Sequence, residues 1–244
     1  MVMASSMDQC RNCGSGLTLE QRYCGSCGQK RGFDRLTIPQ LGHDFLHILT
    51  HLDRSLFPLF RPVLITPGRV ARDFIEGKRK RYFGPLAWLV VISGLFAAEV
   101  AFTGLYAFTP NYRTAFMGLL EHHVNVVYLI QVPVFAFCCR IVFWNDRFNT
   151  AEYLVVAAYT TGVRLLFYGL VLFPVILFVR PSPAAVLDIV LGNVVFWSLY
   201  FGLAVAQLYA GKRIRIAHWL KGSLAALLAT VITSAALSLV STLW

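Results

Sequence analysis

The stretch KRKRYFGPLAWLVVISGLFAAEVAFTGLYAF, residues 78–108, decides the fold of this chain. Four cations stand directly before a long, predominantly apolar run that carries a single acidic residue, Glu99. At 1.5 Å of rise per residue, about 20 apolar residues in a helix cross the ~30 Å hydrocarbon core of a bilayer. The stretch therefore predicts a transmembrane helix with a basic cluster at its start.

The composition of the whole chain also indicates a membrane protein. Of its 244 residues 57% are apolar and 14% charged, whereas a soluble domain usually has about 25% charged residues. Thirteen of the 22 lysines and arginines stand before residue 82, ahead of the apolar runs. The chain thus divides into a polar N-terminal part and a membrane part. Met1–Gln9 has neither a basic start nor an apolar run, so we expect no secretory signal peptide.

Five apolar segments are long enough to span a membrane. The predicted spans are Pro85–Phe108, Val124–Trp144, Glu152–Phe178, Leu187–Tyr209 and Leu224–Leu243. The predicted fold class is therefore an all-α integral membrane protein of about five transmembrane helices with a small N-terminal zinc ribbon. The expected domains are the ribbon over 1–32, amphipathic juxtamembrane helices over 33–83 and the helical bundle over 84–244.

The ribbon is predicted from two cysteine pairs. They read Cys10-Arg-Asn-Cys13-Gly and Cys24-Gly-Ser-Cys27-Gly, with ten residues between them. Zn²⁺ prefers four thiolates in a tetrahedron, and a glycine after each pair allows the tight turn around a metal. We predict one structural Zn²⁺ ion on these four cysteines. An iron site with the same ligands is chemically possible, whereas a redox CxxC would need a thioredoxin-like unit that cannot be built here.

Two observations predict the orientation. Thiolate ligands indicate a reducing compartment and so a cytoplasmic N-terminus. The loop cations then fall mostly inside: Arg140, Arg147, Lys212, Arg213, Arg215 and Lys221, against Arg113 and Arg180 outside. That asymmetry is what the positive-inside rule requires. We expect a multi-pass protein of the cell (inner) membrane with its C-terminus on the far side.

The juxtamembrane region reads as two helices lying along the membrane surface. Thr37-Ile-Pro-Gln40 resembles a capping box that opens the first, and Thr66-Pro67 starts a second that Gly77 ends. His43, His47 and His51 recur every four residues on one face of the first helix. These histidines suit a metal site or a pH sensor. Because no clear fourth ligand accompanies them, we favour a solvated polar face.

The basic cluster Lys78, Arg79, Lys80 and Arg81 precedes the first span. Anionic lipid headgroups attract each such cation by about 1 kcal/mol. The cluster either recognises a lipid or simply anchors the topology, and in both cases contact with lipid headgroups is expected.

Two charged residues lie at membrane depth. A lone charge at mid-bilayer costs on the order of 2.5–3.5 kcal/mol, so Glu99 and Arg164 each need a partner or water. Their depths differ by only about 5 Å, and we predict that they pair. The pair would line a substrate pathway or lock two helices together. Milder polar residues, Gln131, Asn193 and Gln207, are expected to hydrogen-bond between helices.

Several motifs together resemble a known family. They are CxxC, CGxCGQ, His51-x-Asp53, Pro67-Gly68, Gly77-Lys78-Arg79, Tyr82 and Pro85, with Asn149-Thr-Ala-Glu152-Tyr after the second span. This order resembles a bacterial family of uncharacterised membrane proteins with an N-terminal zinc ribbon and a domain of unknown function. The likeness is strongest over residues 10–90. Where related sequences often have Gly after the Asp, this chain has Arg54-Ser55. The resemblance implies a bacterial cytoplasmic membrane protein with four to five spans, and it implies no reaction.

The sequence contains no catalytic constellation, so an enzymatic role is not predicted. A lipid-acting enzyme would need Glu121, His122 and His123, but adjacent histidines on a helix point about 100° apart. We expect a non-enzymatic adaptor or an assembly or regulatory factor, with a protein partner or self-association. The alternative is a small-molecule or ion transporter using Glu99 and Arg164. The net charge of +10 is explained by topology, so no nucleic-acid partner is expected.

Overall fold

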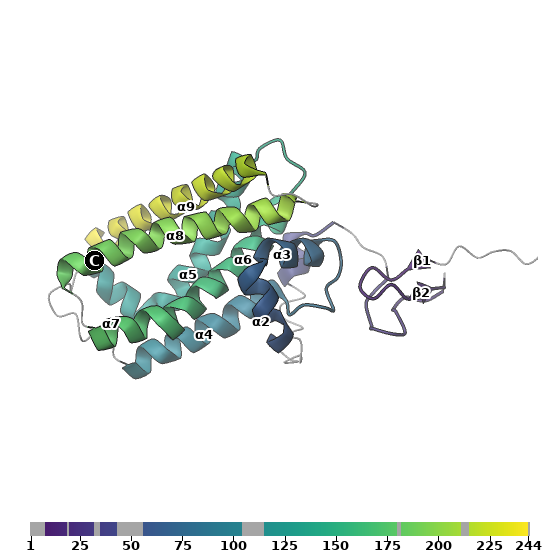
Figure 1. Ribbon diagram of the computed structural model, residues 1–244, viewed down its shortest axis with the longest axis horizontal. Helices are drawn as coiled ribbons and strands as arrows, with labels where there is room; N and C mark the ends of the chain where they lie inside the picture. The colour runs from purple at the N-terminus through teal and green to yellow at the C-terminus, as the bar shows by residue number, and fades with distance from the viewer. Residues whose placement is uncertain are drawn as a thin grey trace, which may run out of the picture.

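The computed structural model describes residues 8–18, 20–31, 35–42, 56–103, 115–179, 182–210 and 215–243. Its elements, in chain order, are β1 (Asp8–Gln9), β2 (Gly16–Leu17), α2 (Leu56–Ile65), α3 (Pro67–Ile75), α4 (Pro85–Thr103), α5 (Ala115–Val142), α6 (Thr150–Phe167), η3 (Tyr168–Leu172), α7 (Phe173–Val179), α8 (Pro183–Tyr209) and α9 (Ile216–Leu243). The two short strands belong to the ribbon, and the long helices form a bundle beside it (Figure 1).

The long helices have the length and composition of membrane spans. In the described part of the chain, four helical segments qualify: Pro85–Thr103, Thr150–Val179, Asp188–Tyr209 and Ile216–Leu239. The apolar part of α5, Val126–Val142, is shorter. Large apolar side chains cover the outside of the bundle, as with Phe102 at 91% and Phe178 at 88% exposed. Hydrocarbon, rather than water, accounts for such a surface. The protein is therefore an all-α integral membrane protein.

The helices α5, α6, α8 and α9 form a closed ring. Helix α8 packs along α9, α9 along α5 and α5 along α6, and α6 returns to α8. Helix α4 lies outside this ring and packs against α6 and α5. Figure 1 shows the same order, with α4 and α9 on opposite sides of the bundle. Everything that lines the inside of the ring therefore comes from four helices, none of which is the first span.

Helix α6 begins with a complete capping box. The Asn149 side chain accepts a hydrogen bond from the main-chain N–H of Glu152 at 2.9 Å, and the Glu152 carboxylate accepts one from the N–H of Asn149 at 2.7 Å. Such a box satisfies two of the free N–H groups of a helix start. It fixes the start of α6 at the Asn149-Thr-Ala-Glu152 motif.

The third span continues through Pro174 because its helix widens locally into a π-turn. Proline lacks an N–H and its ring collides with the carbonyl group four residues earlier. The chain avoids this collision with the π-helical segment η3, in which the main-chain N–H of Phe173 bonds to the carbonyl oxygen of Tyr168. Helix α7 then completes the span to Val179. Such single π-turns occur often beside functional sites.

Helix α3 packs on the bundle with one buried face. It follows Thr66 with Pro67 in its first turn, and the chain leaves it through Gly77, whose φ of 103° favours glycine. Its buried residues contact α6 and α8. The predicted second juxtamembrane helix is thus confirmed, and it is anchored on the ends of two spans. Its position relative to the membrane surface stays a prediction.

Several predicted boundaries need correction. Helix α5 begins at Ala115, nine residues before the predicted Val124, and α9 begins at Ile216, eight residues before Leu224. The sequence signal missed both starts because polar residues, such as His218 and Lys221 in α9, interrupt the apolar pattern there. Of the first juxtamembrane helix, residues 38–42 are helical, and the N–H of Thr37 bonds to the Gln40 side chain at 3.2 Å as half of the expected capping box.

Candidate metal centre and intramembrane charges

The two cysteine pairs form two equivalent turns. Gly14 and Gly28, which follow Cys13 and Cys27, have φ angles of 78° and 69°. Each glycine N–H donates to the carbonyl oxygen of the first cysteine of its own pair at 2.8 Å. Only a residue that tolerates positive φ closes such a turn without strain. The glycine after each CxxC is thus a conformational requirement of the site.

The strand pairing repeats with the same spacing. Gln9 pairs with Gly16 in the β1–β2 hairpin, and Tyr23 forms an isolated bridge with Lys30, fourteen residues later in both partners. The main-chain N–H groups of Cys10 and Cys24 donate to Ser15 and Gln29 at 2.8 Å. The ribbon is therefore built from two copies of one turn that face each other.

The four sulfur atoms meet where the turns face each other. The Sγ atoms of Cys10, Cys13, Cys24 and Cys27 all lie within 4.8 Å of one another. The Cys10–Cys27 and Cys13–Cys24 sulfur distances are both 3.6 Å. Thiolates at about 2.3 Å from a tetrahedral metal lie about 3.8 Å apart. The cluster therefore fits one tetrahedral ion, and all four positions would be occupied by protein.

Hydrogen bonding and burial set the protonation of the thiols. The Ser15 hydroxyl, 3.0 Å from the Cys13 sulfur, lowers the pKa of Cys13 to about 6. The main-chain N–H of Cys27 lowers the pKa of Cys24. Burial raises the pKa of Cys27 to about 11. Metal binding requires the deprotonated form of every ligand, so loading this site releases protons.

The ribbon has almost no apolar core of its own. Its buried cluster consists of Cys10, Leu17 and Cys24, with Cys27 packed against it. Three of these four residues are members of the sulfur cluster. A unit this small cannot compensate the conformational entropy of folding by apolar burial, so a bound metal would supply most of its stability.

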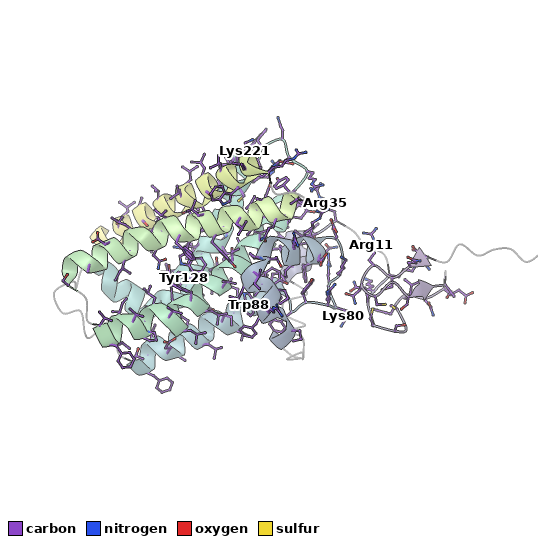
Figure 2. The ribbon with its side chains drawn as sticks, in the orientation of Figure 1. Arg11, Arg35, Lys80, Trp88, Tyr128 and Lys221 are labelled. Carbon is purple, nitrogen blue, oxygen red and sulfur yellow. The ribbon has the colours of Figure 1, made fainter. Side chains whose placement is uncertain are left out.

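The chain that follows the ribbon is fixed to the start of α6. Arg35 forms an ion pair with Glu152 at 3.1 Å and also donates to the carbonyl oxygen of Arg147. The Asn149 amide donates to the carbonyl oxygen of Leu36 at 2.9 Å, and the Leu36 side chain is fully buried. Figure 2 shows Arg35 at the end of the bundle that faces the ribbon. The residues of the α6 capping box thus also hold the ribbon linker.

The basic cluster divides into inner and outer members. Lys78 forms an ion pair with Asp73 at 2.6 Å, and Tyr82 donates to the other oxygen of Asp73 at 2.9 Å. Burial, with this hydrogen bond, raises the pKa of Tyr82 to about 12.

The other three members differ in exposure. Arg79 is half-buried, with its guanidinium carbon 5.7 Å from the Phe74 ring centre, whereas Lys80 and Arg81 are exposed. The main-chain N–H of Lys80 also donates to Gln29 of the ribbon at 3.3 Å. Contact of the four cations with lipid headgroups stays a prediction.

The structure gives Glu99 and Arg164 different surroundings. Arg164 is 8% exposed and donates to the Gln131 side chain within the ring of helices. The Glu99 carboxylate, on α4, lies instead against Gly169. None of the ion pairs seen among the described residues includes either side chain. Their pairing stays a prediction, and it would require both side chains to leave these contacts.

The face of α6 around Arg164 points inward as expected. Tyr153, Ala157 and Thr161 are buried, and Tyr168 donates to Asn193 at 2.9 Å. The expected hydrogen bonds of Gln131 and Gln207 are also present. Gln131 contacts Arg164 and Thr233, and Gln207 accepts from the Gly68 N–H at 3.1 Å. Sequence reasoning did not identify Tyr128, Trp197 or Arg35, because an isolated aromatic or cation carries no motif.

Some predicted residues lie outside the part of the chain that the structure describes. They are His43, His47 and His51, and the side chains of Glu121, His122 and His123. Cys138 and Cys139 are buried in α5, as small apolar side chains would be.

These features define the class of the protein: a multi-pass membrane protein with an N-terminal four-cysteine ribbon that can hold a metal ion. A family model described as Protein of unknown function (DUF3667) matches residues 53–97, which span α2, α3, the basic cluster and the first part of α4. Comparison with curated proteins and comparison with solved structures each gave no match.

Proposed function

We propose that this protein is a non-enzymatic membrane adaptor or an assembly or regulatory factor. Its ribbon, held by one structural Zn²⁺ ion, presents a rigid surface to a protein partner beside the cytoplasmic face of a bacterial inner membrane. The helical bundle anchors that surface and supplies contacts within the bilayer. In the alternative form of this proposal, the same surface binds a second copy of this chain.

The observation that carries the proposal is the closed sulfur cluster. Four thiolates complete the coordination of a tetrahedral ion, so no position is left for a substrate or an activated water. Zinc, rather than iron, is the metal we propose, since structural sites of this ligand set commonly hold it. The Arg35–Glu152 ion pair and the Asn149–Leu36 hydrogen bond then hold the linker on α6. A partner bound to the ribbon is thereby connected to the bundle.

The ribbon offers one obvious contact residue. Tyr23 is 60% exposed although it is a large aromatic side chain, and Arg22 beside it is also exposed. Tyrosine and arginine are over-represented among the residues that dominate protein interfaces. We therefore place the centre of the partner surface at Tyr23.

We expect Tyr23→Ala to release the partner without releasing the metal. The tagged protein is purified in mild detergent from its own organism, and the bound proteins are quantified by mass spectrometry. A partner that copurifies in stoichiometric amount with the wild type should fall by roughly tenfold or more in Tyr23→Ala, because hot-spot truncations cost at least about 2 kcal/mol. Gln9→Ala, the equivalent exposed position in the other turn of the ribbon, is the control. A wild type that is monomeric and free of protein partners would contradict the proposal.

We also propose that the ribbon end of the bundle faces the cytoplasm. The described cations of the helix ends, Arg140, Arg147, Arg215 and Lys221, lie at this end with the cluster 78–81. The sequence assigns only Arg113 and Arg180 to the opposite side, and both lie outside the described residues. This distribution supports the positive-inside orientation. Members of the cluster 78–81 would then lie near anionic headgroups.

The orientation predicts the location of the C-terminus. An odd number of spans places it across the membrane from the ribbon. A reporter enzyme that works only outside the cytoplasm should be active when fused after Trp244 and inactive when fused after Arg147. The reverse pattern would exclude a cytoplasmic ribbon.

Transport is the second candidate function. The polar surroundings of Arg164 within the ring of helices support it, because intramembrane charges mark many substrate pathways. Nucleic acid is not a proposed partner, since the positive-inside orientation explains most of the excess positive charge.

A further inference from the structure

The ring of helices α5, α6, α8 and α9 lines a partly open cavity of about 160 Å³. Its lining includes Tyr128 and Gln131 of α5, Arg164 of α6, Asn193 and Trp197 of α8, and Thr230 of α9. No residue of α4 contributes, so Glu99 lies outside it. A water molecule occupies about 30 Å³ of liquid, so the space suits several waters or one small ligand.

The cavity lies deep in the bundle. Arg164 is fourteen residues from the start of α6, which is about 21 Å along the helix axis. Trp197 is twelve residues from the other end of its helix, Tyr209, which is about 18 Å. Both helix ends lie on the ribbon side of the bundle, and Tyr128 lies midway along it (Figure 2). The cavity is therefore near the middle of the predicted membrane layer.

The charge in this cavity has no counter-charge in the part of the protein that the structure describes. Arg164 takes part in none of the ion pairs seen there. Its guanidinium carbon lies 5.0 Å from the ring centre of Tyr128, 5.8 Å from that of Phe135 and 6.0 Å from that of Tyr168. Aromatic faces compensate a cation only in part. An arginine at this depth is costly unless something neutralises it.

Two buried donors at the cavity have no acceptor among the residues that the structure describes. The Nε–H of Arg164 and the indole N–H of Trp197 are both shielded from solvent and without a hydrogen-bond partner. Both side chains are more than nine-tenths buried. Leaving such donors unbonded in a low-dielectric interior is unfavourable. A ligand with acceptor oxygens would satisfy both.

The neighbouring polar groups add donors or are already bonded. Tyr168 donates to the side-chain oxygen of Asn193. The other polar group of that amide, its NH₂, can only donate hydrogen bonds. The hydroxyl groups of Thr160, Ser198 and Thr230 donate to main-chain carbonyls of their own helices. None of the described carboxylates lines the cavity. The π-turn η3 begins at Tyr168 and shapes the same wall.

We propose that this cavity binds a small oxyanion, of the carboxylate or phosphate class, on the guanidinium of Arg164 and the indole N–H of Trp197. A planar guanidinium matches the oxygens of both anions, and an anion would neutralise the buried charge. The aromatic rings of Tyr128 and Phe135 would enclose the apolar part of an organic carboxylate. The anion is either a free small molecule or the acidic group of a lipid-derived molecule that enters between helices.

The test uses the full-length protein in detergent. Its thermal unfolding is followed while sodium acetate or sodium phosphate is titrated at constant ionic strength, which a bulky sulfonate too large for the cavity maintains. A ligand at free concentration L that binds only the folded state stabilises it by RT ln(1 + L/Kd), so the melting temperature keeps rising with the logarithm of the ligand concentration above the dissociation constant. The wild type should show this logarithmic rise with at least one of the two anions.

Three variants locate the effect. Arg164→Gln should raise the apparent dissociation constant by roughly tenfold or more, because it removes the charged donor. Trp197→Phe keeps an aromatic ring but removes the indole N–H, and should raise the constant by roughly threefold to tenfold. Arg69→Gln removes one charge from the exposed face of α3 and should leave the response unchanged. If Arg164→Gln does not fold, the dissociation constant of Trp197→Phe is compared with that of the wild type instead.

Ligand retained through purification distinguishes the two sources. Denatured wild-type protein is analysed by mass spectrometry for small water-soluble acids and, after solvent extraction, for fatty acids and phospholipids. Either kind, retained by the wild type and depleted in Arg164→Gln, supports the proposal. The proposal is overturned if wild type and Arg164→Gln respond equally to the anions, or if the wild type neither responds nor retains an anion. The cavity would then hold only water.

Discussion

Replacing Cys24 and Cys27 together by serine should remove the bound metal completely and unfold the ribbon. Metal binding supplies about 10–16 kcal/mol in small zinc domains, and here the apolar cluster outside the sulfur atoms is reduced to Leu17. Elemental analysis of the purified wild type should give one zinc per chain, and the double variant should give none. Proteolysis within residues 8–31 should become rapid while the helical bundle stays intact.

A matched control separates ligand loss from general damage. Cys138→Ala removes a thiol that is buried in α5, far along the chain from the cluster. It should retain the full metal content and a resistant ribbon. If the wild type contains iron in place of zinc, the predicted identity of the metal is wrong but the four-cysteine site stands. A metal-free wild type with disulfide-bonded cysteines would contradict the ribbon itself.

Gly68→Ala should destabilise the protein by about 2 kcal/mol or more. A methyl group on Gly68 would overlap the carbonyl oxygen of Ala204 in α8 and lie 2.7 Å from the Gln207 Cβ. A main-chain atom cannot rotate away, so α3 would have to move off α8. That movement breaks the Gly68–Gln207 hydrogen bond and the one from Arg72 to the carbonyl oxygen of Ala210 at 2.8 Å. Overpacking of a close contact typically costs about 1–3 kcal/mol before such losses.

The measurement is the melting temperature in detergent. Gly192→Ala, in α8, is the matched control, because a methyl group there meets nothing within 4 Å. It should leave the melting temperature unchanged or raise it slightly, since alanine favours helix more than glycine does. Equal melting temperatures for Gly68→Ala and Gly192→Ala would show that α3 does not depend on its close approach to α8.

Local sequence signals predicted several helices and the cysteine turns correctly. The span over Pro85–Thr103 and the helix that begins at Thr66-Pro67 are present where the apolar run and the proline predicted them. The four cysteines gather because each CxxC turn is local and its glycine takes the required positive φ. Errors arose where polar residues extend an apolar helix. The extra turns of α5 and α9 are stabilised by helical hydrogen bonding, which leaves no apolar pattern in the sequence.

Pairing between distant elements could not be predicted in the same way. The sequence indicated that Glu99 and Arg164 have similar depths, but depth does not say which face of its helix each side chain occupies. In the structure α4 packs outside the ring of helices, so Glu99 faces Gly169 while Arg164 faces Gln131. The same limit explains why Trp197 was not identified. Its missing acceptor is a property of the surrounding helices.

The sequence by itself determined that hydrocarbon surrounds the helices and that four thiolates form one cluster, because both follow from composition and short-range spacing. Only the tertiary structure decided that α5, α6, α8 and α9 close around Arg164 and that α3 lies on α8 through Gly68. The physical reason is the range of the interactions. Bilayer length and CxxC geometry act within about 30 residues, whereas the packing of α3 on α8 joins Gly68 and Gln207, which are 139 residues apart in the chain.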